Sequence, residues 1–420
     1  MMFDKIVINI SRIPIFYFLL IILCTGFILR TAAWFYFGTN LMEYNADGSF
    51  YQNEYEFLAS SIIQGNWEEY FSHSRYYQPV YGLLLTPRYY FNLPQESYIF
   101  CLHHFLSLAT IYIIYLIGKR IFGVYFGLVS AFLISINAMI IFWFPWVYSD
   151  TAFHFFIALF ALMATNLYKS QKSVNYALFF FSGFLCTFTR PEGIFIFLSA
   201  ILVLIFIHLI QRFSFRKAIV IIIGTIFFLS TIMITTLAYH KKTQEAFLSQ
   251  FHISLAIYVS SKIATNSPEE QDKLYGVTIH EELRNARTQP DYISDNYSLS
   301  MIGLKFIKEN PINWLAMYAS RLTANLFPSI YSPNWSLGHR IYNFSMAFML
   351  IIGGIMATLF SDLRRFSAVT LVIMAFTLAL SMTLFQREID YRVPLSIFIL
   401  FSMTAPYGWF KFYEYLKQKQ

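Results

Sequence analysis

Long apolar runs separated by short polar connections recur along almost the whole chain. A helix of about 20 apolar residues crosses roughly 30 Å of hydrocarbon, at about 1.5 Å per residue. The pattern therefore predicts an all-α polytopic membrane protein with about ten transmembrane helices. We place these helices at residues 13–36, 97–118, 121–143, 151–168, 175–190, 194–211, 218–238, 341–360, 366–385 and 391–410.

Basic residues in the short connections give the expected orientation. Lys119 and Arg120 join the second and third spans, and Arg364 and Arg365 join the eighth and ninth. If ten spans are counted, every basic connection and the C-terminal tail fall on one side, which the positive-inside rule makes cytoplasmic. The remaining basic positions on that side are Lys5, Arg12, Lys169, Lys172, Arg212, Arg216, Lys217 and the lysines of 411–419.

Two long connections fall on the outer side, at 37–96 and 239–340. The first contains amphipathic patches at 49–64 and 79–91, which predict helices lying along the membrane surface. The second begins with a polar stretch and becomes amphipathic at 302–327, within which the run 311–327 is nearly long enough to span. We assign this run to the interface or to a re-entrant position, because counting it as a crossing would place the next basic connection outside.

Composition supports the membrane assignment and excludes one class of partner. Hydrophobic residues make up 57% of the 420 residues and charged residues 13%, with a mean hydropathy of +0.53. A soluble protein is nearer one-quarter charged. The net charge of +7 does not indicate a nucleic-acid partner, because the Lys and Arg residues lie mainly in connections, where they set topology.

Two acidic residues on the outer side, Asp47 and Asp150, are candidates for a functional role. Asp47 precedes Gly48-Ser49 and a helix-forming run, so a helix cap is the simplest interpretation. If the helix begins near Asp47, Tyr51 and Glu54 share its face, which gathers two acids and a phenol. Asp150 follows Ser149 between the third and fourth spans, beside an aromatic belt, where a cap is again the alternative to a functional role.

Arginines form the second group of outer residues. Arg190 ends an apolar span and either pairs with Glu192 or faces another partner, since an Arg near bilayer depth costs about 2.5–3.5 kcal/mol on insertion scales. A dense cluster between two spans contains Arg387, Tyr391 and Arg392, for which solvated loop charge is the alternative. The other outer cations are Arg75, Arg88, His339 and Arg340.

These residues combine two kinds of chemistry on one side of the membrane. A carboxylate deprotonates a hydroxyl, and arginines hold phosphate through paired charge-assisted hydrogen bonds. The combination suits a lipid-phosphate donor that delivers a group to an acceptor outside the cytoplasm. No Gly-rich phosphate loop between a strand and a helix is visible, and no compelling metal constellation is either. We therefore expect neither a nucleotide nor a metal cofactor.

Several short elements are also similar to those of a known family. Asp47 lies in the first outer loop, 77–82 reads Tyr-Gln-Pro-Val-Tyr-Gly, Asp150 opens the fourth span, and 189–192 reads Thr-Arg-Pro-Glu. In these elements, and in Glu-Asn-Pro at 309–311, the sequence resembles the GT-C class of membrane glycosyltransferases. The resemblance is strongest to the bacterial branch related to protein O-mannosyltransferases and lipid A aminoarabinose transferases, and it covers the first 200 residues best.

The resemblance implies an inverting transfer of a sugar from a polyprenyl-phosphate donor to a glycolipid, lipopolysaccharide or O-antigen, or protein acceptor. Asp47 matches the general base of the family, and Asp150 matches its second acid, which orients the acceptor or the sugar. Gln78 departs from the aminoarabinose branch, which often has a basic residue there, so Arg75, about one helical turn earlier, takes the phosphate contact. Arg190 and Arg387 are the other phosphate candidates. The further substrate-binding candidates are Glu54, Arg392, Tyr391, His339 and Arg340.

The resemblance also implies a division of the chain and a location. Residues 1–238 form a GT-C-like catalytic core that includes the first outer loop, 239–340 form a large extracytoplasmic loop, and 341–420 hold C-terminal spans and a cytoplasmic tail. We expect membrane lipids around the spans, and an active site that faces the periplasm or exterior of a bacterial inner membrane.

Two other classes of function stay open. A secondary transporter would have related halves and broken helices that meet at mid-membrane, whereas here the halves do not mirror each other and the charges are expected at the outer rim. A polysaccharide ligase or polymerase would use lipid-pyrophosphate glycans and a catalytic residue in the large outer loop, such as His339 or Arg340.

Overall fold

The described part of the chain is all helix, apart from turns and connections. The computed structural model describes residues 14–44, 57, 59–66, 79–146, 148–170, 172–190, 192–210, 219, 221–226, 308, 311–327, 336–360, 366–385 and 393–419. No strand occurs within these ranges. Four helices in them are long and apolar enough to cross a membrane, and several shorter apolar helices accompany them. The expected all-α membrane architecture is confirmed.

The first half of the chain supplies eight of the helices in the described ranges, and the second half supplies five. The first eight are α2 (Ile15–Tyr44), α5 (Pro79–Tyr90), α6 (Gln95–Ile121), α7 (Val124–Ser135), α8 (Ala138–Trp143), α9 (Asp150–Lys169), α10 (Ser173–Thr189) and α11 (Gly193–Ile210). The other five are α17 (Pro311–Leu326), α18 (Leu337–Leu359), α19 (Phe366–Phe385), α20 (Val393–Ser402) and α21 (Ala405–Lys419).

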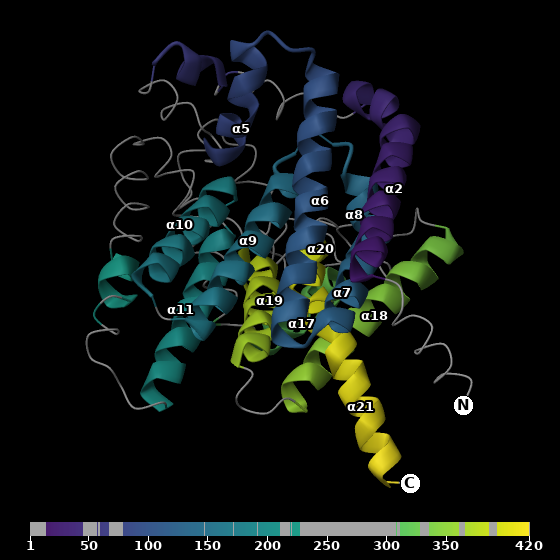
Figure 1. Ribbon diagram of the computed structural model, residues 1–420, viewed down its shortest axis with the longest axis vertical. Coiled ribbons are helices and arrows are strands. Elements are labelled where there is room, and N and C mark those ends of the chain that lie inside the picture. The colour runs from purple at the N-terminus through teal and green to yellow at the C-terminus, as the bar shows by residue number, and fades with distance from the viewer. Residues whose placement is uncertain are drawn as a thin grey trace.

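Helix α9 lies at the centre of the bundle. It packs against α6, α10, α19 and α20, and Phe153, Ile157 and Phe160 on it are fully buried. Figure 1 shows α5 at one end of the bundle and the C-terminal helix α21 protruding at the opposite end. We call these the α5 end and the α21 end. Because α9 packs against helices from both halves of the chain, these helices together fix the position of its first residue, Asp150.

Two expected spans are interrupted. The run 121–143 forms two helices, since α7 ends at Ser135 and α8 begins at Ala138, and the run 391–410 is divided between α20 and α21. Asn137 explains the first break, because its side-chain oxygen accepts the backbone N–H groups of Met139 and Ile140, both at 3.1 Å. Asn commonly caps a helix in this way, and a new helix therefore starts inside the apolar run.

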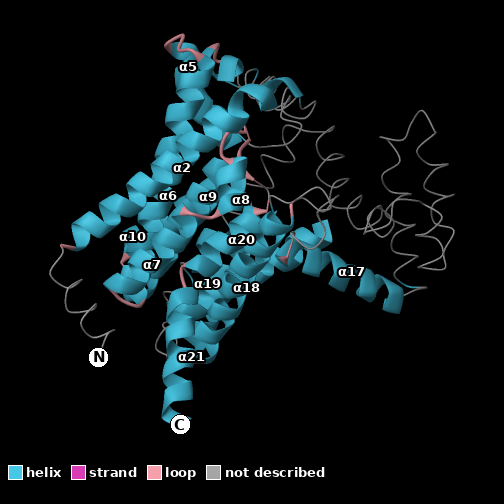
Figure 2. Cartoon of the chain, turned by 90° about the vertical axis from the view of Figure 1, so that its right-hand side faces the viewer, coloured by secondary structure: helices cyan, strands magenta, loops and turns pink. Residues whose placement is uncertain are grey.

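Two of the expected amphipathic segments lie in the described ranges and are helical, and of the third, 49–64, residues 57 and 59–63 are described and are also helical. The 79–91 patch forms α5, and the 311–327 run forms α17. Helix α17 projects sideways from the bundle (Figure 2) and exposes Ile312 and Leu315. The surface position of these helices in the membrane stays a prediction.

Glycines allow the backbones of α18 and α21 to come into direct contact. A Cβ on Gly408 would overlap the carbonyl oxygen of Gly353, and a Cβ on Gly353 would overlap the ring of Trp409. The indole N–H of Trp409 donates to the carbonyl of Met349 at 2.8 Å across the same contact. Small residues are the usual means by which membrane helices pack closely, because lipid supplies no hydrophobic driving force between them.

We therefore expect Gly408→Ala to destabilise the protein by about 1–3 kcal/mol, because the added methyl group meets backbone rather than a movable side chain. The melting temperature of purified protein in detergent measures this loss. Gly338→Ala is the matched control, since nothing lies within 4 Å of a Cβ at that position. Equal melting temperatures for the two variants would show that the helices do not meet as described.

Candidate active site

An ionic cluster joins the start of α9 to the end of α10. The Arg190 guanidinium binds the carboxylate of Asp150 through Nη1 and that of Glu192 through Nη2, the second contact at 3.1 Å. Its Nε also donates to Glu192 at 3.4 Å, and its guanidinium carbon lies 5.7 Å from the centre of the Phe153 ring. The side chains of Arg190 and Asp150 are only 11% and 6% exposed, so the pair is largely shielded from water.

The cluster carries a net charge of −1 when both acids are ionised. One guanidinium faces two carboxylates, and the low exposure of the pair means that solvent screens the charges weakly. The positive charge of Arg190 is therefore already used in holding Asp150 and Glu192. The alternatives that the sequence left open for Arg190 both apply, because it pairs with its near neighbour Glu192 and with an acid from a distant segment.

An aromatic wall adjoins Asp150. The rings of Trp146 and Tyr148 stack at 5.7 Å with planes 12° apart, and the ring of Trp143 lies 5.2 Å from that of Trp146. Trp146 and Tyr148 are buried. The short connection between α8 and α9 is consequently a packed structure rather than a solvated loop, and it supports the backbone just before Asp150.

A hydrogen-bonded chain ties α5 to this connection. The hydroxyl of Tyr81 lies 2.9 Å from Nε2 of His103, and Nδ1 of the same ring lies 3.0 Å from the carbonyl oxygen of Phe144. Since a carbonyl only accepts, Nδ1 carries the proton and Nε2 accepts from Tyr81. Burial, with a smaller contribution from Asp150, raises the pKa of the Tyr81 hydroxyl, so it stays a donor. This chain gives a structural role to the Tyr-Gln-Pro-Val-Tyr-Gly element.

Arg30 is a further polar residue at the break between α7 and α8, and the sequence reasoning missed it. Its side chain is fully buried and donates to the hydroxyl of Ser107, to the carbonyls of Gly26 and Ser135 at 3.1 Å, and to that of Ile134 at 3.4 Å. The hydroxyl of Tyr342 reaches the next carbonyl, that of Ile136, at 2.8 Å.

The partners of Arg30 explain how a charge persists inside an apolar bundle. The last carbonyls of a helix lack intrahelical donors and carry the negative end of the helix dipole. Arg30 supplies N–H groups to two of those of α7, the carbonyls of Ser135 and Ile134, and the second also accepts the backbone N–H of Asn137 at 3.4 Å. Inside an apolar bundle such groups need partners from the protein itself. The expectation that the charges lie only at the outer rim is therefore wrong for Arg30. The available signal was an Arg within an apolar run, which usually marks a functional or structural partner.

Of the other candidates from the sequence, the structure describes His339 and Arg340. His339 is exposed at the start of α18, where its Nδ1 lies 2.8 Å from the hydroxyl of the cap residue Ser336. The Nε of Arg340 is buried and has no hydrogen-bond partner within the described ranges. Seven candidates lie outside the described residues, namely Asp47, Glu54, Arg75, Gln78, Arg387, Tyr391 and Arg392. The structure thus brings Asp150 and Arg190 together and leaves the placement of Asp47 as a prediction.

No group of three or more His, Cys, Asp or Glu side chains suited to a metal ion occurs within the described residues. Asp150 and Glu192 are two carboxylates at one place, but both already bind Arg190. The adjacent His103 and His104 have separate partners, since the ring of His104 contacts Thr31 and the carbonyl of Phe100. The expectation of no cofactor stays a prediction.

Comparison with known proteins gives no family assignment. No protein-family model matches the chain, and no curated protein matches it. The similar solved structures include archaeal oligosaccharyltransferase AglB from Archaeoglobus fulgidus in complex with an inhibitory peptide and a dolichol-phosphate, with a TM-score of 0.49 and 12% identity over 96% of this chain and 52% of that one.

A second such structure is the Archaeoglobus fulgidus oligosaccharyltransferase complex with Zn and sulfate, with a TM-score of 0.47 and 13% identity over 91% of this chain and 48% of the other. This chain spans about half the length of these oligosaccharyltransferases. A likeness at such TM-scores establishes neither the fold nor the activity of this chain.

If Arg30 satisfies the end of α7, Arg30→Met should destabilise the protein by about 1–3 kcal/mol for each buried carbonyl left without a donor. The melting temperature in detergent reports this loss. The control is Arg120→Met, because Arg120 is exposed near the end of α6. A melting temperature for Arg30→Met at or above that of the wild type would show that the break needs no cap.

Proposed function

We propose that this chain is an inverting glycosyltransferase that moves a sugar from a polyprenyl-phosphate donor to an acceptor outside the cytoplasm. One observation carries the proposal: the shielded carboxylate of Asp150 is held by Arg190 at the first residue of the central helix, beside the aromatic wall. Asp150 and Arg190 come from two of the elements in which the sequence resembles the GT-C class. The acceptor would be a glycolipid, lipopolysaccharide or O-antigen, or protein.

The proposed reaction breaks the bond between the anomeric carbon of the sugar and a phosphate oxygen of the lipid. The hydroxyl oxygen of the acceptor forms the new bond on the opposite face of the anomeric carbon, which inverts its configuration. The acceptor proton passes to the carboxylate of Asp47, the proposed general base. Polyprenyl phosphate departs as a monoester, so the transfer needs no nucleotide.

Asp150 would orient the acceptor or the sugar by accepting hydrogen bonds from hydroxyl groups. A carboxylate does this best when it stays ionised and fixed, and Arg190 provides both conditions. Position matters strongly, because a misplacement of about 1 Å in a reacting group can lower a rate about 100-fold. Arg190 then serves to position Asp150 rather than to bind the donor phosphate, since two acids already neutralise its charge.

The donor phosphate would be bound by cationic side chains that form no ion pair with a carboxylate. Arg340 fits this condition in the described ranges, since its Nε has no hydrogen-bond partner there. It lies two residues before Tyr342, whose hydroxyl binds the interrupted span that leads to the aromatic wall and Asp150. Fixed guanidinium groups stabilise the charge that develops on a leaving phosphate. Arg75, Arg387 and Arg392 stay proposals for the same role.

We expect Asp47→Asn and Asp150→Asn each to lower sugar transfer by a factor of about 100 or more, as loss of a general base or of an orienting group does. Transfer is measured as released polyprenyl phosphate with purified protein in nanodiscs, a panel of polyprenyl-phosphate sugars, and extracts of surface glycolipid as acceptor. Glu96→Gln, in the first turn of α6, is the control. Wild-type turnover in both acid variants would refute these assignments.

For the phosphate role, Arg340→Gln should weaken binding of polyprenyl phosphate about 10-fold, as expected for loss of a charge-assisted hydrogen bond. Arg340→Lys should recover part of the affinity, and Arg120→Gln should leave it unchanged. The affinity is measured by tryptophan fluorescence during titration with the lipid. Unchanged affinity in Arg340→Gln would remove Arg340 from the phosphate site.

A secondary transporter is the second candidate, and the interrupted span favours it. Carriers place broken helices and buried charges near the middle of the membrane, and here the buried Arg30 binds the break between α7 and α8. The two functions separate in one experiment. Proteoliposomes that contain the protein either release polyprenyl phosphate from a sugar-loaded donor, as the glycosyltransferase requires, or accumulate a solute without a change in the lipid.

A further inference from the structure

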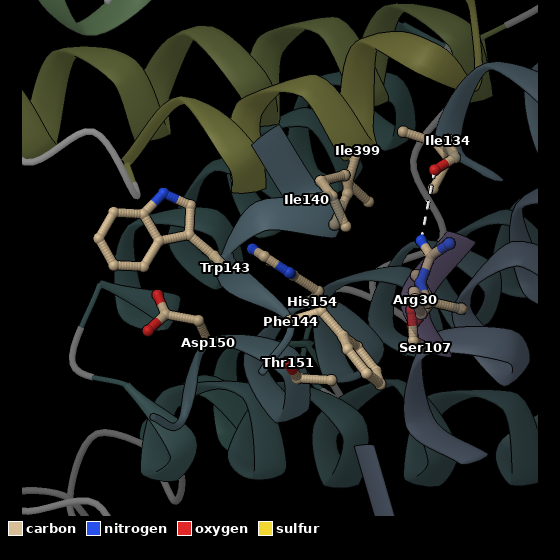
Figure 3. A pocket seen from close by; sticks show the side chains of 11 residues that line it. Arg30, Ser107, Ile134, Ile140, Trp143, Phe144, Asp150, Thr151, His154 and Ile399 are labelled. Atoms are coloured by element: carbon tan, nitrogen blue, oxygen red, sulfur yellow. Dashed lines mark hydrogen bonds between the residues drawn. The ribbon is translucent and has the colours of Figure 1, made fainter. Parts of the chain in front are cut away.

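A small cavity, lined by both polar and apolar side chains, lies inside the bundle between Asp150 and Arg30. Its volume is about 10 Å³, which is room for about one water molecule. Figure 3 shows the imidazole of His154 across this space, with Asp150 and Trp143 on one side and Arg30 on the other. The lining side chains that can hydrogen-bond include Arg30, Ser107, Thr110, Asp150, Thr151 and His154.

His154 has an unmet hydrogen-bonding requirement. Its side chain is buried, with 6% exposed, and its Nε2 has no hydrogen-bond partner within the described residues. A buried polar atom without a partner costs about 1–3 kcal/mol. Native proteins retain few such atoms, and an ordered water is a common reason for those that remain.

The same helix face carries Asp150. His154 follows it by four residues on α9, so both side chains lie on one face, one turn apart. A carboxylate oxygen can accept more than one hydrogen bond, so Asp150 can bind Arg190 and still accept another donor. Neutral imidazole offers one donor and one acceptor nitrogen. With the ring proton on Nδ1, the carboxylate oxygen and Nε2 are both acceptors, so together they suit a molecule that donates two hydrogen bonds, as water does.

We propose that this cavity binds one water molecule that bridges His154 Nε2 to the Asp150 carboxylate, and that His154 is a positioning residue for Asp150. The water donates one O–H to the carboxylate and the other to Nε2, while Nδ1 carries the ring proton. Empty cavities that stay dry are apolar, whereas this one is lined by several polar side chains.

The bridge acts together with Arg190. Arg190 holds the Asp150 carboxylate from the end of α10, and the water would hold it from within the bundle. Second partners of this kind fix the orientation of a functional group to well within 1 Å, as a group that positions a sugar hydroxyl needs. The role of the water in transfer rests on the proposed function, whereas its presence does not.

The first test locates the water directly in the wild-type protein. A cryo-electron microscopy map at about 2 Å should show a density peak within hydrogen-bonding distance of both His154 Nε2 and an Asp150 oxygen. No peak at that position, with the side chains well defined, would overturn the proposal. This result does not depend on any enzymatic activity.

The second test compares two substitutions by melting temperature. His154→Gln keeps a polar group near the water, so its melting temperature should stay near that of the wild type. His154→Leu removes the partner of the water, and the melting temperature should fall by about 2–4 °C. If the cavity is dry, His154→Leu should instead raise the melting temperature, because it removes an unsatisfied polar atom. That rise would overturn the proposal.

The third test addresses positioning through kinetics. His154→Leu should lower kcat for sugar transfer about 10-fold with little change in KM for the donor, and His154→Gln should recover most of kcat. An unchanged kcat in His154→Leu would overturn the positioning role. If the wild-type protein transfers no sugar, the proposed function fails, and the density and melting temperatures still decide whether the water is present.

Discussion

The arrangement of the bundle depends on one constraint, which is that a helix broken inside an apolar environment must satisfy its free backbone groups within the protein. The third span breaks between Ser135 and Ala138. Arg30 and Tyr342 donate to the carbonyls on one side of the break, and Asn137 accepts from the amides on the other. Three segments far apart in sequence are thereby joined at one place.

This join fixes the start of the segment that leads to the ionic cluster. Helix α8 starts from the break and leads into the aromatic wall, and the wall ends at Asp150, the first residue of α9. Arg190 then holds Asp150 from the end of α10. The buried Arg30 and the shielded ionic cluster are therefore linked by a short, packed segment. Burial makes both features sensitive to substitution, since water is unable to replace a lost partner.

Hydrophobic pattern alone predicted most of the helices. Spans of about 20 apolar residues are a strong signal because the bilayer sets their length, and the polar composition of the connections marked where most of them end. The two interrupted spans were not predicted as such. A single Asn137 hardly lowers the mean hydropathy of a window of about 20 residues. Its capping role is evident only from the hydrogen bonds that its side chain accepts from backbone N–H groups.

The candidate site was predictable in part. Asp150 and Arg190 stood out because charged residues at the ends of apolar spans are costly and usually have partners. Their contact with each other was not predictable, since 40 residues separate them. His154 and Arg30 were not selected at all. Each lies within a mainly apolar helix, and only the cavity and the hydrogen bonds around them show what they contact.

The central claim is that the shielded cluster of Asp150, Arg190 and Glu192 belongs to a site for a lipid-linked sugar. The most direct measurement is a cryo-electron microscopy structure of the protein with a polyprenyl-phosphate sugar bound. We expect the sugar to lie against Asp150 and the aromatic wall, with its phosphate beside a guanidinium that no acid neutralises. A donor headgroup bound at the α21 end, among Lys119, Arg120 and Lys411, would contradict the claim.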